Sequence, residues 1–169
     1  SVSGGRMERP GEQVALDVGL RVRAAAKHVS RGGGKLEAAL DGFAITVAER
    51  ICLDAGCSTG GFTDCLLQRG AARVYAVDVG YGQLAWSLRT DPRVVLYERT
   101  NVRSLRHEDL DPAPTLVVAD LSFVSLRSVL PALVELCARP GELVVLVKPQ
   151  FELQPAQIFT LLFLMLGPF

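Results

Sequence analysis

The chain has 169 residues, of which 49% are hydrophobic, and its 18 basic and 18 acidic side chains give a formal net charge of zero. This length and apolar content suffice for one well-packed domain with a small appendage. Zero net charge excludes binding to nucleic acid through the field of the whole molecule, so any such affinity has to come from a local patch.

The cysteines predict a reducing compartment. None of them shows the paired CxxC spacing of a metal site, and three lie in or beside apolar runs. We therefore expect buried, reduced thiols and a cytoplasmic location. The polar segment 1–11 lacks the apolar core of a signal peptide, which agrees with that location. The four cysteines are Cys52, Cys57, Cys65 and Cys137.

The first part of the chain combines a short apolar alternation with a run of basic residues. Apolar side chains fall on every second position over residues 14–22, which predicts a half-buried strand or tight hairpin. No acidic residue occurs between Asp17 and Glu37. A solvated basic face is one interpretation, but the single sign of charge favours a strip that binds phosphates. The basic residues of this strip are Arg21, Arg23, Lys27, Arg31 and Lys35, with His28 among them.

Residues 29–37 read Val-Ser-Arg-Gly-Gly-Gly-Lys-Leu-Glu and lead into a helical pattern. Leu36, Ala39, Leu40 and Phe43 mark one face of this predicted helix. We expect the glycines to precede the helix and to interrupt packing with the basic strip. The predicted units are therefore an N-terminal remnant over 1–28, a main domain over 29–152 and an apolar tail over 153–169.

The stretch 50–61 predicts a strand, a tight turn and a helix. A short apolar run over 51–53 suits a strand buried on both faces, and small residues then lead into a helical pattern. Gly56, Gly60 and Gly61 do not match the G-x-G-x-x-G dinucleotide fingerprint, and no Gly-Lys-Ser/Thr phosphate loop follows. Glycines at such a turn let the backbone approach a ligand, so a nucleotide-like ligand is expected.

The remaining elements alternate between helix and strand, which predicts a doubly wound α/β sheet. The predicted helices cover 62–69 and 125–138, the second with a kink at Pro131. The predicted strands cover 74–77, 93–97, 116–120 and 143–147. Because ligands of parallel sheets lie beyond the carboxyl ends of the strands, we expect four side chains to point toward one crevice. They are Asp54, Asp78, Asp120 and Lys148.

Asp78 follows the second predicted strand and has two possible roles. A carboxylate at this position can accept hydrogen bonds from both hydroxyls of a ribose, as nucleoside cofactors require. Alternatively, it can cap the next helix. The ribose role is the favoured one.

Three motifs resemble known families. Asp54 followed by Gly56 and a small polar turn resembles motif I of S-adenosylmethionine-dependent methyltransferases. Val-Ser-Arg-Gly-Gly-x-Lys-Leu at 29–36 and Ser-Thr-Gly-Gly-Phe-Thr-Asp at 58–64 resemble the bacterial hemolysin A family, a branch of the FtsJ-like ribosomal RNA methyltransferases. Residues 11–22 are similar to the closing part of an S4-type RNA-binding domain, most of which this chain would lack.

The resemblance implies a Rossmann-like methyltransferase sheet without its last strands, with S-adenosyl-L-methionine as cofactor. It implies ribosomal RNA or ribosomal subunits as partners, with methylation of the ribose 2′-hydroxyl, of cytidine in particular, and no stable membrane insertion. The implied cofactor-binding residues are Asp54, Gly56, Ser58, Thr59, Gly60, Gly61, Phe62, Asp78, Asn101 and Asp120. The RNA-binding residues are expected to be Arg21, Arg23, Lys27, Arg31 and Lys35.

The FtsJ-like family uses a Lys-Asp-Lys-Glu tetrad, and motif matching carries Lys35, Asp120 and Lys148 onto its first three places. Our hypothesis makes Lys148 the base, Lys35 its electrostatic neighbour and substrate holder, and Asp120 the group that orients Lys148. The glutamate is expected on a later strand, and Glu152 lies too near Lys148 to fill its place.

The C-terminal segment and two other classes of function also enter the predictions. The apolar run 158–169 is too short to span a bilayer and departs from the family's pattern, which suggests a truncated or frame-altered end. An amphiphilic segment that contacts a membrane or a partner is the other interpretation. Two further function classes stay open, namely a catalytically incomplete module that binds cofactor and RNA, and a membrane-active hemolysin-type protein.

Overall fold

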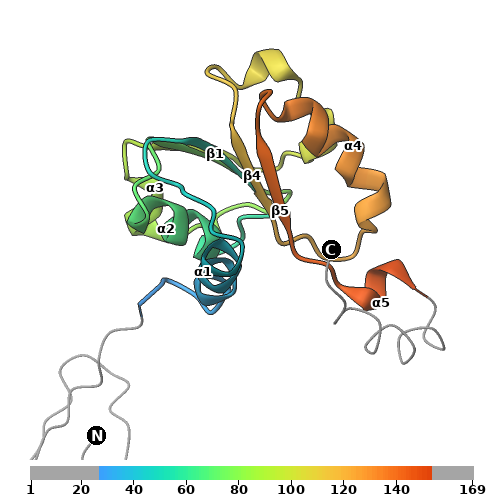
Figure 1. Cartoon of the computed structure of the whole chain (residues 1–169), viewed down its shortest axis with the longest axis horizontal. Coiled ribbons are helices and arrows are strands. Elements are labelled where there is room, and N and C mark those ends of the chain that lie inside the picture. The colour runs from blue at the N-terminus through green and yellow to red at the C-terminus, as the bar shows by residue number, and fades with distance from the viewer. Residues whose placement is uncertain (1–26, 154–169) are drawn as a thin grey trace, which may run out of the picture.

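The structure is a computed structural model that describes residues 27–153 (Figure 1). The predicted strand or hairpin over 14–22, the basic residues Arg21 and Arg23, and all but the first residue of the apolar tail lie outside the described residues.

A five-stranded parallel sheet with the order β3-β2-β1-β4-β5 forms the centre of the molecule. The order reverses beside β1, where β2 lies on one side and β4 on the other, and ligands of such sheets bind at this point. The predicted doubly wound α/β sheet is thereby confirmed. Its strands are β1 (Ile51–Ala55), β2 (Arg73–Val77), β3 (Val94–Tyr97), β4 (Leu116–Ala119) and β5 (Glu142–Val145).

Apolar side chains that alternate along the strands build one core on each face of the sheet. Cys52 belongs to the core under the helices α1, α2 and α3, whereas the next residue, Leu53, belongs to the core under α4. Strands buried on both faces need such nearly continuous apolar runs. The helices are α1 (Gly32–Gly42), α2 (Gly61–Gln68), α3 (Trp86–Arg89), α4 (Leu126–Leu136) and α5 (Pro149–Glu152), and two 3-10 turns cover Val102–Ser104 and His107–Asp109.

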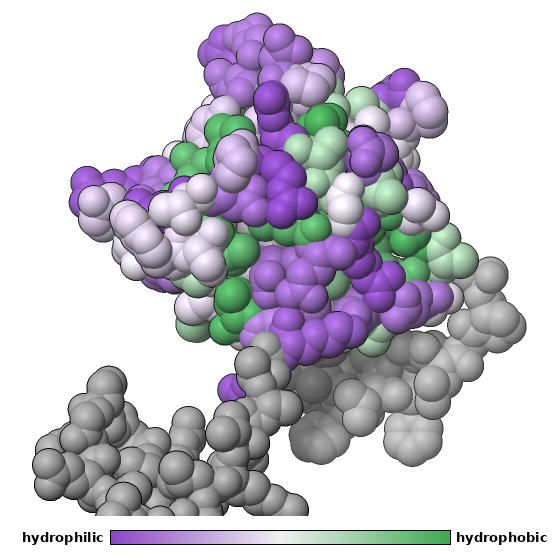
Figure 2. All heavy atoms as spheres, turned by 90° about the vertical axis from the view of Figure 1, so that its left-hand side faces the viewer, coloured by the Kyte–Doolittle hydropathy of each residue, from purple (hydrophilic) through white to green (hydrophobic). Residues whose placement is uncertain are grey.

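The helices cover both faces of the sheet. Figure 1 shows α2 and α3 on one side and α4 on the other. Figure 2 views the molecule from the side of α2 and α3, where hydrophilic residues cover most of the surface and hydrophobic residues form separate small areas. Within residues 27–153, no helix combines the length and the apolar content that crossing a bilayer requires.

The first helix differs from the prediction at both ends. α1 begins at Gly32, so the three glycines lie inside the helix and not before it. Leu36 and Leu40 are buried as predicted, but Phe43 follows the helix and is 72% exposed. The prediction for Phe43 was wrong because the chain leaves the helix at Gly42, one residue before Phe43 would reach the buried face.

The other predicted elements are confirmed with small shifts at their ends. α4 begins after Ser125, whose hydroxyl accepts a hydrogen bond from the Arg127 N–H, and it continues through Pro131. β4 ends at Ala119 and β5 at Val145, so Asp120 and Lys148 lie in the loops beyond these strands. Strand ends thus deliver the polar residues to one edge of the sheet.

The cysteines are buried and free within the described residues, as expected. Burial raises the pKa of the Cys65 thiol to about 11 and that of Cys52 to about 12. The thiols therefore stay protonated and pack as small apolar groups.

Candidate active site

The site forms where the turn after β1 meets the loop after β4. Gly56 has a φ of +83° and Gly60 a φ of +98°, in the left-handed region that favours glycine. A Cβ atom on Gly56 would lie 2.9 Å from the carbonyl oxygen of Asp120. Glycine at position 56 is therefore required both by its backbone angles and by the close approach of the two loops.

Two adjacent cavities open at this edge of the sheet, and they share Gly56, Ser58, Asp120 and Ser122. The first has a volume of about 620 Å³ and is lined by charged and small polar residues. The second has a volume of about 550 Å³ and has a more apolar lining. The shared residues form the boundary at which a molecule in one cavity would meet a molecule in the other.

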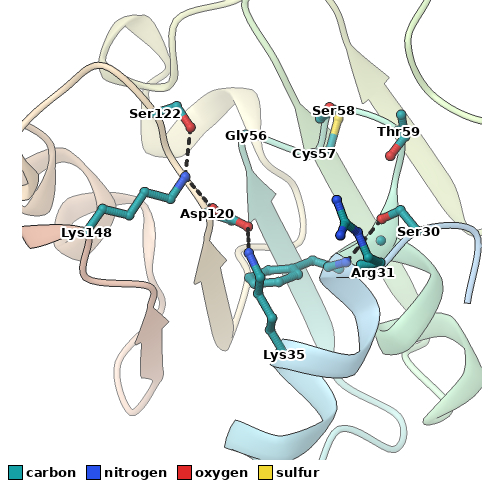
Figure 3. A pocket seen from close by; sticks show the side chains of 13 residues that line it. Ser30, Arg31, Lys35, Gly56, Cys57, Ser58, Thr59, Asp120, Ser122 and Lys148 are labelled. Atoms are coloured by element: carbon teal, nitrogen blue, oxygen red, sulfur yellow. Dashed lines mark hydrogen bonds and ion pairs between the residues drawn. The ribbon is translucent and has the colours of Figure 1, made fainter. Parts of the chain in front are cut away.

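Asp120 stands on this boundary between two lysines. Its Oδ1 lies 2.7 Å from Lys148 Nζ, and its Oδ2 lies 3.6 Å from Lys35 Nζ. Figure 3 shows the two lysines reaching Asp120 from different elements, Lys35 from α1 and Lys148 from the loop after β5. The structure therefore brings together the three residues that the sequence placed in one cluster.

Ser122 is a member of this cluster that the sequence analysis missed. Its hydroxyl accepts a hydrogen bond of 2.7 Å from Lys148 Nζ, so the amine is held by two oxygens (Figure 3). Its place two residues after Asp120, in the same strand-end loop, was the available signal. A serine in a loop is too common for that signal to stand out.

Asp78 organises the turn on the side of the second cavity. Its Oδ2 accepts a hydrogen bond of 2.8 Å from the Ser58 N–H, and its Oδ1 accepts one of 2.7 Å from the Gly80 N–H. Each carboxylate oxygen keeps a further lone pair for a ligand. Asp78 and Asn101 both line the second cavity. Asp78 can therefore accept hydrogen bonds from a ribose in addition to its two bonds from backbone N–H groups.

Asp54 does not join the crevice that the sequence predicted for it. It has no exposed surface, lines neither cavity and accepts a 2.7 Å hydrogen bond from the Thr63 hydroxyl. Burial raises the pKa of Asp54 to about 7. The expectation that four charged side chains meet in one crevice was wrong in this respect, because Asp54 lies within β1 and not beyond its end.

The remaining residues of the glycine turn differ in which cavity they line. Thr59, Gly61 and Phe62 line the first cavity, and Ser58 lines both. Gly60 lines neither, because its backbone packs against α3, where a Cβ would lie 2.2 Å from a methyl group of Leu88.

The described residues of the basic strip differ in their surroundings. Arg31 and Lys35 line the first cavity, whereas Lys27 is ion-paired with Glu37. The buried ring of His28 lies between two carboxylates, with Nε2 3.6 Å from Glu37 and Nδ1 3.6 Å from Asp64. The sequence shows a single sign of charge here, but folding brings in acidic partners from α1 and α2.

Glu152 lies apart from the lysine cluster. Its Oε1 accepts a hydrogen bond of 2.7 Å from the Leu126 N–H, and its Oε2 accepts one of 2.7 Å from the Ser125 hydroxyl. These contacts, the Leu126 N–H first, lower the pKa of Glu152. Among residues 27–153, Asp120 is the only carboxylate lining the first cavity, so no described residue takes the fourth place of the tetrad.

Comparisons with known proteins agree with this geometry. The family model described as "FtsJ-like methyltransferase" matches residues 28–160. The chain is 64% identical over 130 residues to the 16S/23S rRNA (cytidine-2′-O)-methyltransferase TlyA of Mycobacterium tuberculosis, which covers 77% of this chain and 48% of the relative. It is 46% identical over 133 residues to hemolysin A of Brachyspira hyodysenteriae, with 78% of this chain and 55% of the relative covered.

A solved structure matches the fold closely. A Lactococcus lactis protein described as a candidate hemolysin has a TM-score of 0.76 and 48% sequence identity, over 79% of this chain and 64% of that chain. The chain thus spans about half the length of the curated relatives that it matches.

Proposed function

The chain belongs to the FtsJ-like methyltransferase family, and from this premise we propose that it methylates the ribose 2′-hydroxyl of ribosomal RNA, with S-adenosyl-L-methionine as methyl donor. The observation that carries the proposal is the cluster of Lys35, Asp120 and Lys148, in which two lysines of the first cavity contact Asp120 on the boundary between the cavities. A methyl transfer in line needs donor and acceptor on opposite sides of one narrow contact, and this boundary offers such a place.

The second cavity has the features that a nucleoside donor requires. Asp78 supplies carboxylate oxygens for ribose hydroxyls, and Asn101 supplies an amide near the far end. Val77, Val102 and Leu121 add apolar surface on which an adenine ring can lie. When bound there, S-adenosyl-L-methionine supplies an electrophilic methyl group on its sulfonium.

The first cavity has the features that an RNA strand requires. Arg31 and Lys35 supply positive charge for phosphates, and Ser30 supplies a hydroxyl. The backbone of RNA would run past α1 and bring a ribose to the boundary. Arg21, Arg23 and Lys27 are proposed to extend this contact, and ribosomal RNA as substrate implies a cytoplasmic site of action.

The chain's own residues would handle the proton and the charge. Lys148, as the neutral amine, takes the proton from the 2′-hydroxyl and becomes an ammonium, while the oxygen takes the methyl group; its Nζ contacts Asp120 and Ser122, which line both cavities. Asp120 and Ser122 orient that amine through contacts of 2.7 Å each. Lys35, on the other oxygen of Asp120, holds the substrate and contributes positive charge beside Lys148.

The test is to incubate the purified chain with labelled S-adenosyl-L-methionine and ribosomal RNA, and to look for label in dinucleotides that resist alkali. A methylated 2′-hydroxyl blocks alkaline cleavage, so label in those dinucleotides supports ribose methylation, and their sequence reports whether cytidine is modified. Cofactor binding without label would instead support a module that binds cofactor and RNA but lacks the fourth tetrad residue.

The hemolysin name of one relative motivates a second measurement, the leakage of dye from liposomes. We expect no leakage, because the proposed methyl transfer accounts for the polar cluster and its two cavities. Leakage at protein concentrations that give no methylation would favour the membrane-active class.

A further inference from the structure

Two loops that carry the reactive cluster meet at three points along their length. The loop after β4 holds Asp120 and Ser122, and the segment after β5 holds Lys148. The first meeting point is the contact of Lys148 with Asp120 and Ser122. The other two involve residues further along both segments, and neither belongs to the cavities' shared boundary.

The second meeting point is an aromatic pair. The rings of Phe123 and Phe151 have centroids 5.4 Å apart at an angle of 49°. Phe123 has a φ of +61°, a left-handed conformation that side chains other than glycine adopt only when the surrounding structure holds them. The Phe123 side chain is 91% exposed, so its pair with Phe151 is a surface contact that links the loop after β4 to the α5 segment.

The third meeting point is the carboxylate of Glu152. It accepts one hydrogen bond from the Ser125 hydroxyl and one from the Leu126 N–H, each of 2.7 Å, at the start of α4. An ionised carboxylate at the N-terminus of an 11-residue helix is stabilised by the helix dipole as well as by the hydrogen bonds. Glu152 thus fixes the far end of the same loop that begins with Asp120.

One helical turn connects Glu152, which is anchored at the start of α4, to the backbone of Lys148. α5 starts directly after Lys148, and the Phe151 N–H donates a 2.9 Å hydrogen bond to the Lys148 carbonyl. The Leu153 N–H donates a 3.0 Å hydrogen bond to the Pro149 carbonyl. Because these bonds close a single turn between Lys148 and Leu153, a displacement of Glu152 would move the backbone from which the Lys148 side chain extends.

We propose that Glu152 is a positioning residue for Lys148, tying the α5 turn to the loop that carries Asp120 and Ser122. Lysine has a long flexible side chain, so its amine stays on Asp120 only if the backbone at both ends of the contact is fixed. Glu152 acts through Lys148, since it lines neither cavity. Its consequence for catalysis rests on the proposed function, whereas the fixation itself does not.

Acetylation of lysines, followed by mass spectrometry of the whole chain, tests the fixation without reference to activity. The Lys148 side chain is 18% exposed and held by two oxygens, whereas the Lys27 side chain is 66% exposed, pairs with Glu37 on α1 and serves as the internal reference. In Glu152→Ala, the loss of two hydrogen bonds to a charged group should raise the acetylation rate of Lys148 at least about fivefold. The rate of Lys27 should stay within about twofold.

Matched variants separate the carboxylate from its partners. Glu152→Gln keeps an acceptor for the Leu126 N–H, and Ser125→Ala removes one of the two donors to Glu152 together with the hydroxyl that caps α4, so both should raise the Lys148 rate by less than Glu152→Ala does. Glu108→Ala removes an exposed carboxylate on the 3-10 turn His107–Asp109 and should leave the acetylation rate of Lys148 unchanged.

If circular dichroism shows that Glu152→Ala does not fold, Glu152→Gln and Ser125→Ala decide the question. An unchanged Lys148 rate in the folded variants would overturn the proposal.

Steady-state kinetics of the wild type and of Glu152→Ala then test the consequence for catalysis. Glu152→Ala should lower kcat for methyl transfer about tenfold and leave the KM for S-adenosyl-L-methionine within about twofold, because a misplaced base affects the transition state and not cofactor binding. An unchanged kcat would overturn the positioning role. Absence of methyl transfer by the wild type would count against the proposed function, and acetylation would still decide the fixation.

Discussion

At the scale of single residues, Asp120 is the group on which the site depends. Its two carboxylate oxygens contact two different lysines, and the backbone at Asp120 is approached by Gly56. One carboxylate thereby joins α1, the turn after β1, and the loops after β4 and β5. A change at any of these elements reaches the others through Asp120.

The first prediction concerns Lys148 as the proposed base. Lys148→Ala should lower methyl transfer by at least about 100-fold, since removing a general base costs catalysis on this scale. Its binding of S-adenosyl-L-methionine, measured by titration calorimetry, should stay near the wild-type value, because the residues proposed to hold the adenosine lie in the other cavity. Turnover at the wild-type rate would remove Lys148 from its assigned role.

The second prediction concerns Asp54 and the dependence of stability on pH. The pKa of Asp54 is raised by burial from its ordinary value of 3.8 to about 7. Below the ordinary value, the carboxyl is protonated in both folded and unfolded states. As the pH rises toward 7, the unfolded chain ionises while the folded protein still holds the proton, so the free energy of unfolding falls.

Asp54→Asn removes this pH dependence, because asparagine does not ionise. The free energy of unfolding of the variant minus that of the wild type should rise between pH 4 and pH 8, by at most about 4 kcal/mol. Urea unfolding at several pH values measures it. Asp91→Asn is the control, since Arg93 holds the pKa of Asp91 below its usual range and the difference should stay constant from pH 5 to pH 8. A difference independent of pH for Asp54→Asn would contradict the burial effect.

At the scale of elements, the close packing between the starts of α1 and α2 explains Gly33 of α1 and Gly61 of α2. A Cβ on Gly33 would lie 2.4 Å from the ring of His28, and a Cβ on Gly61 would lie 2.2 Å from the Ser30 hydroxyl. These contacts bring the N-terminal ends of α1 and α2 together beside the first cavity. Helix propensity is given up at these positions in exchange for the close approach.

The third prediction compares two neighbouring glycines of α1. Gly33→Ala should destabilise the fold by about 1–3 kcal/mol, because its new methyl group overlaps the buried ring of His28. Gly34→Ala meets no atom within 4 Å and should stabilise the helix by about 0.5–1 kcal/mol. Thermal unfolding followed by circular dichroism measures both. Equal effects of the two substitutions would show that packing against His28 does not constrain α1.

At the scale of the whole molecule, the absence of net charge determines how RNA can be bound. With 18 basic and 18 acidic residues, affinity for RNA has to come from a local group of cations, such as those at the first cavity and the basic residues proposed to extend that contact. Acidic partners already engage part of the basic strip, as the pair of Lys27 and Glu37 shows. We therefore expect weak binding with a small dependence on salt.

The fourth prediction puts a value on this dependence. With about three phosphates contacted, the slope of log K against log salt for single-stranded RNA should be near −2, and Arg31→Ala should reduce its magnitude by about 0.7. Arg93→Ala is the matched control, because Arg93 precedes β3 at the opposite edge of the sheet and pairs with Asp91 at 2.7 Å. Fluorescence anisotropy at several salt concentrations gives the slopes. Equal slopes for both variants would exclude Arg31 as a phosphate contact.

The apolar runs of the sequence predict where along the chain the five strands lie, because strands buried on both faces need apolar runs that stand out locally. They also predict that Asp120 and Lys148 meet at one edge, since parallel strands deliver their carboxyl ends there. Lys35 lies on a helix, and only the family resemblance assigned it to the same cluster. Strand ends are local features, so a local pattern can predict them.

Tertiary contacts alone set the positions of Asp54 and Glu152, the hydrogen bond from the Lys148 amine to Ser122, and the place of His28 between two acids. Each of these depends on contacts between segments far apart in the chain. In the sequence, a carboxylate at the end of a strand looks identical whether its side chain faces a cavity or, like Asp54, accepts a hydrogen bond from a buried threonine. The partner on the neighbouring element makes the difference, and no local pattern of residues contains that partner.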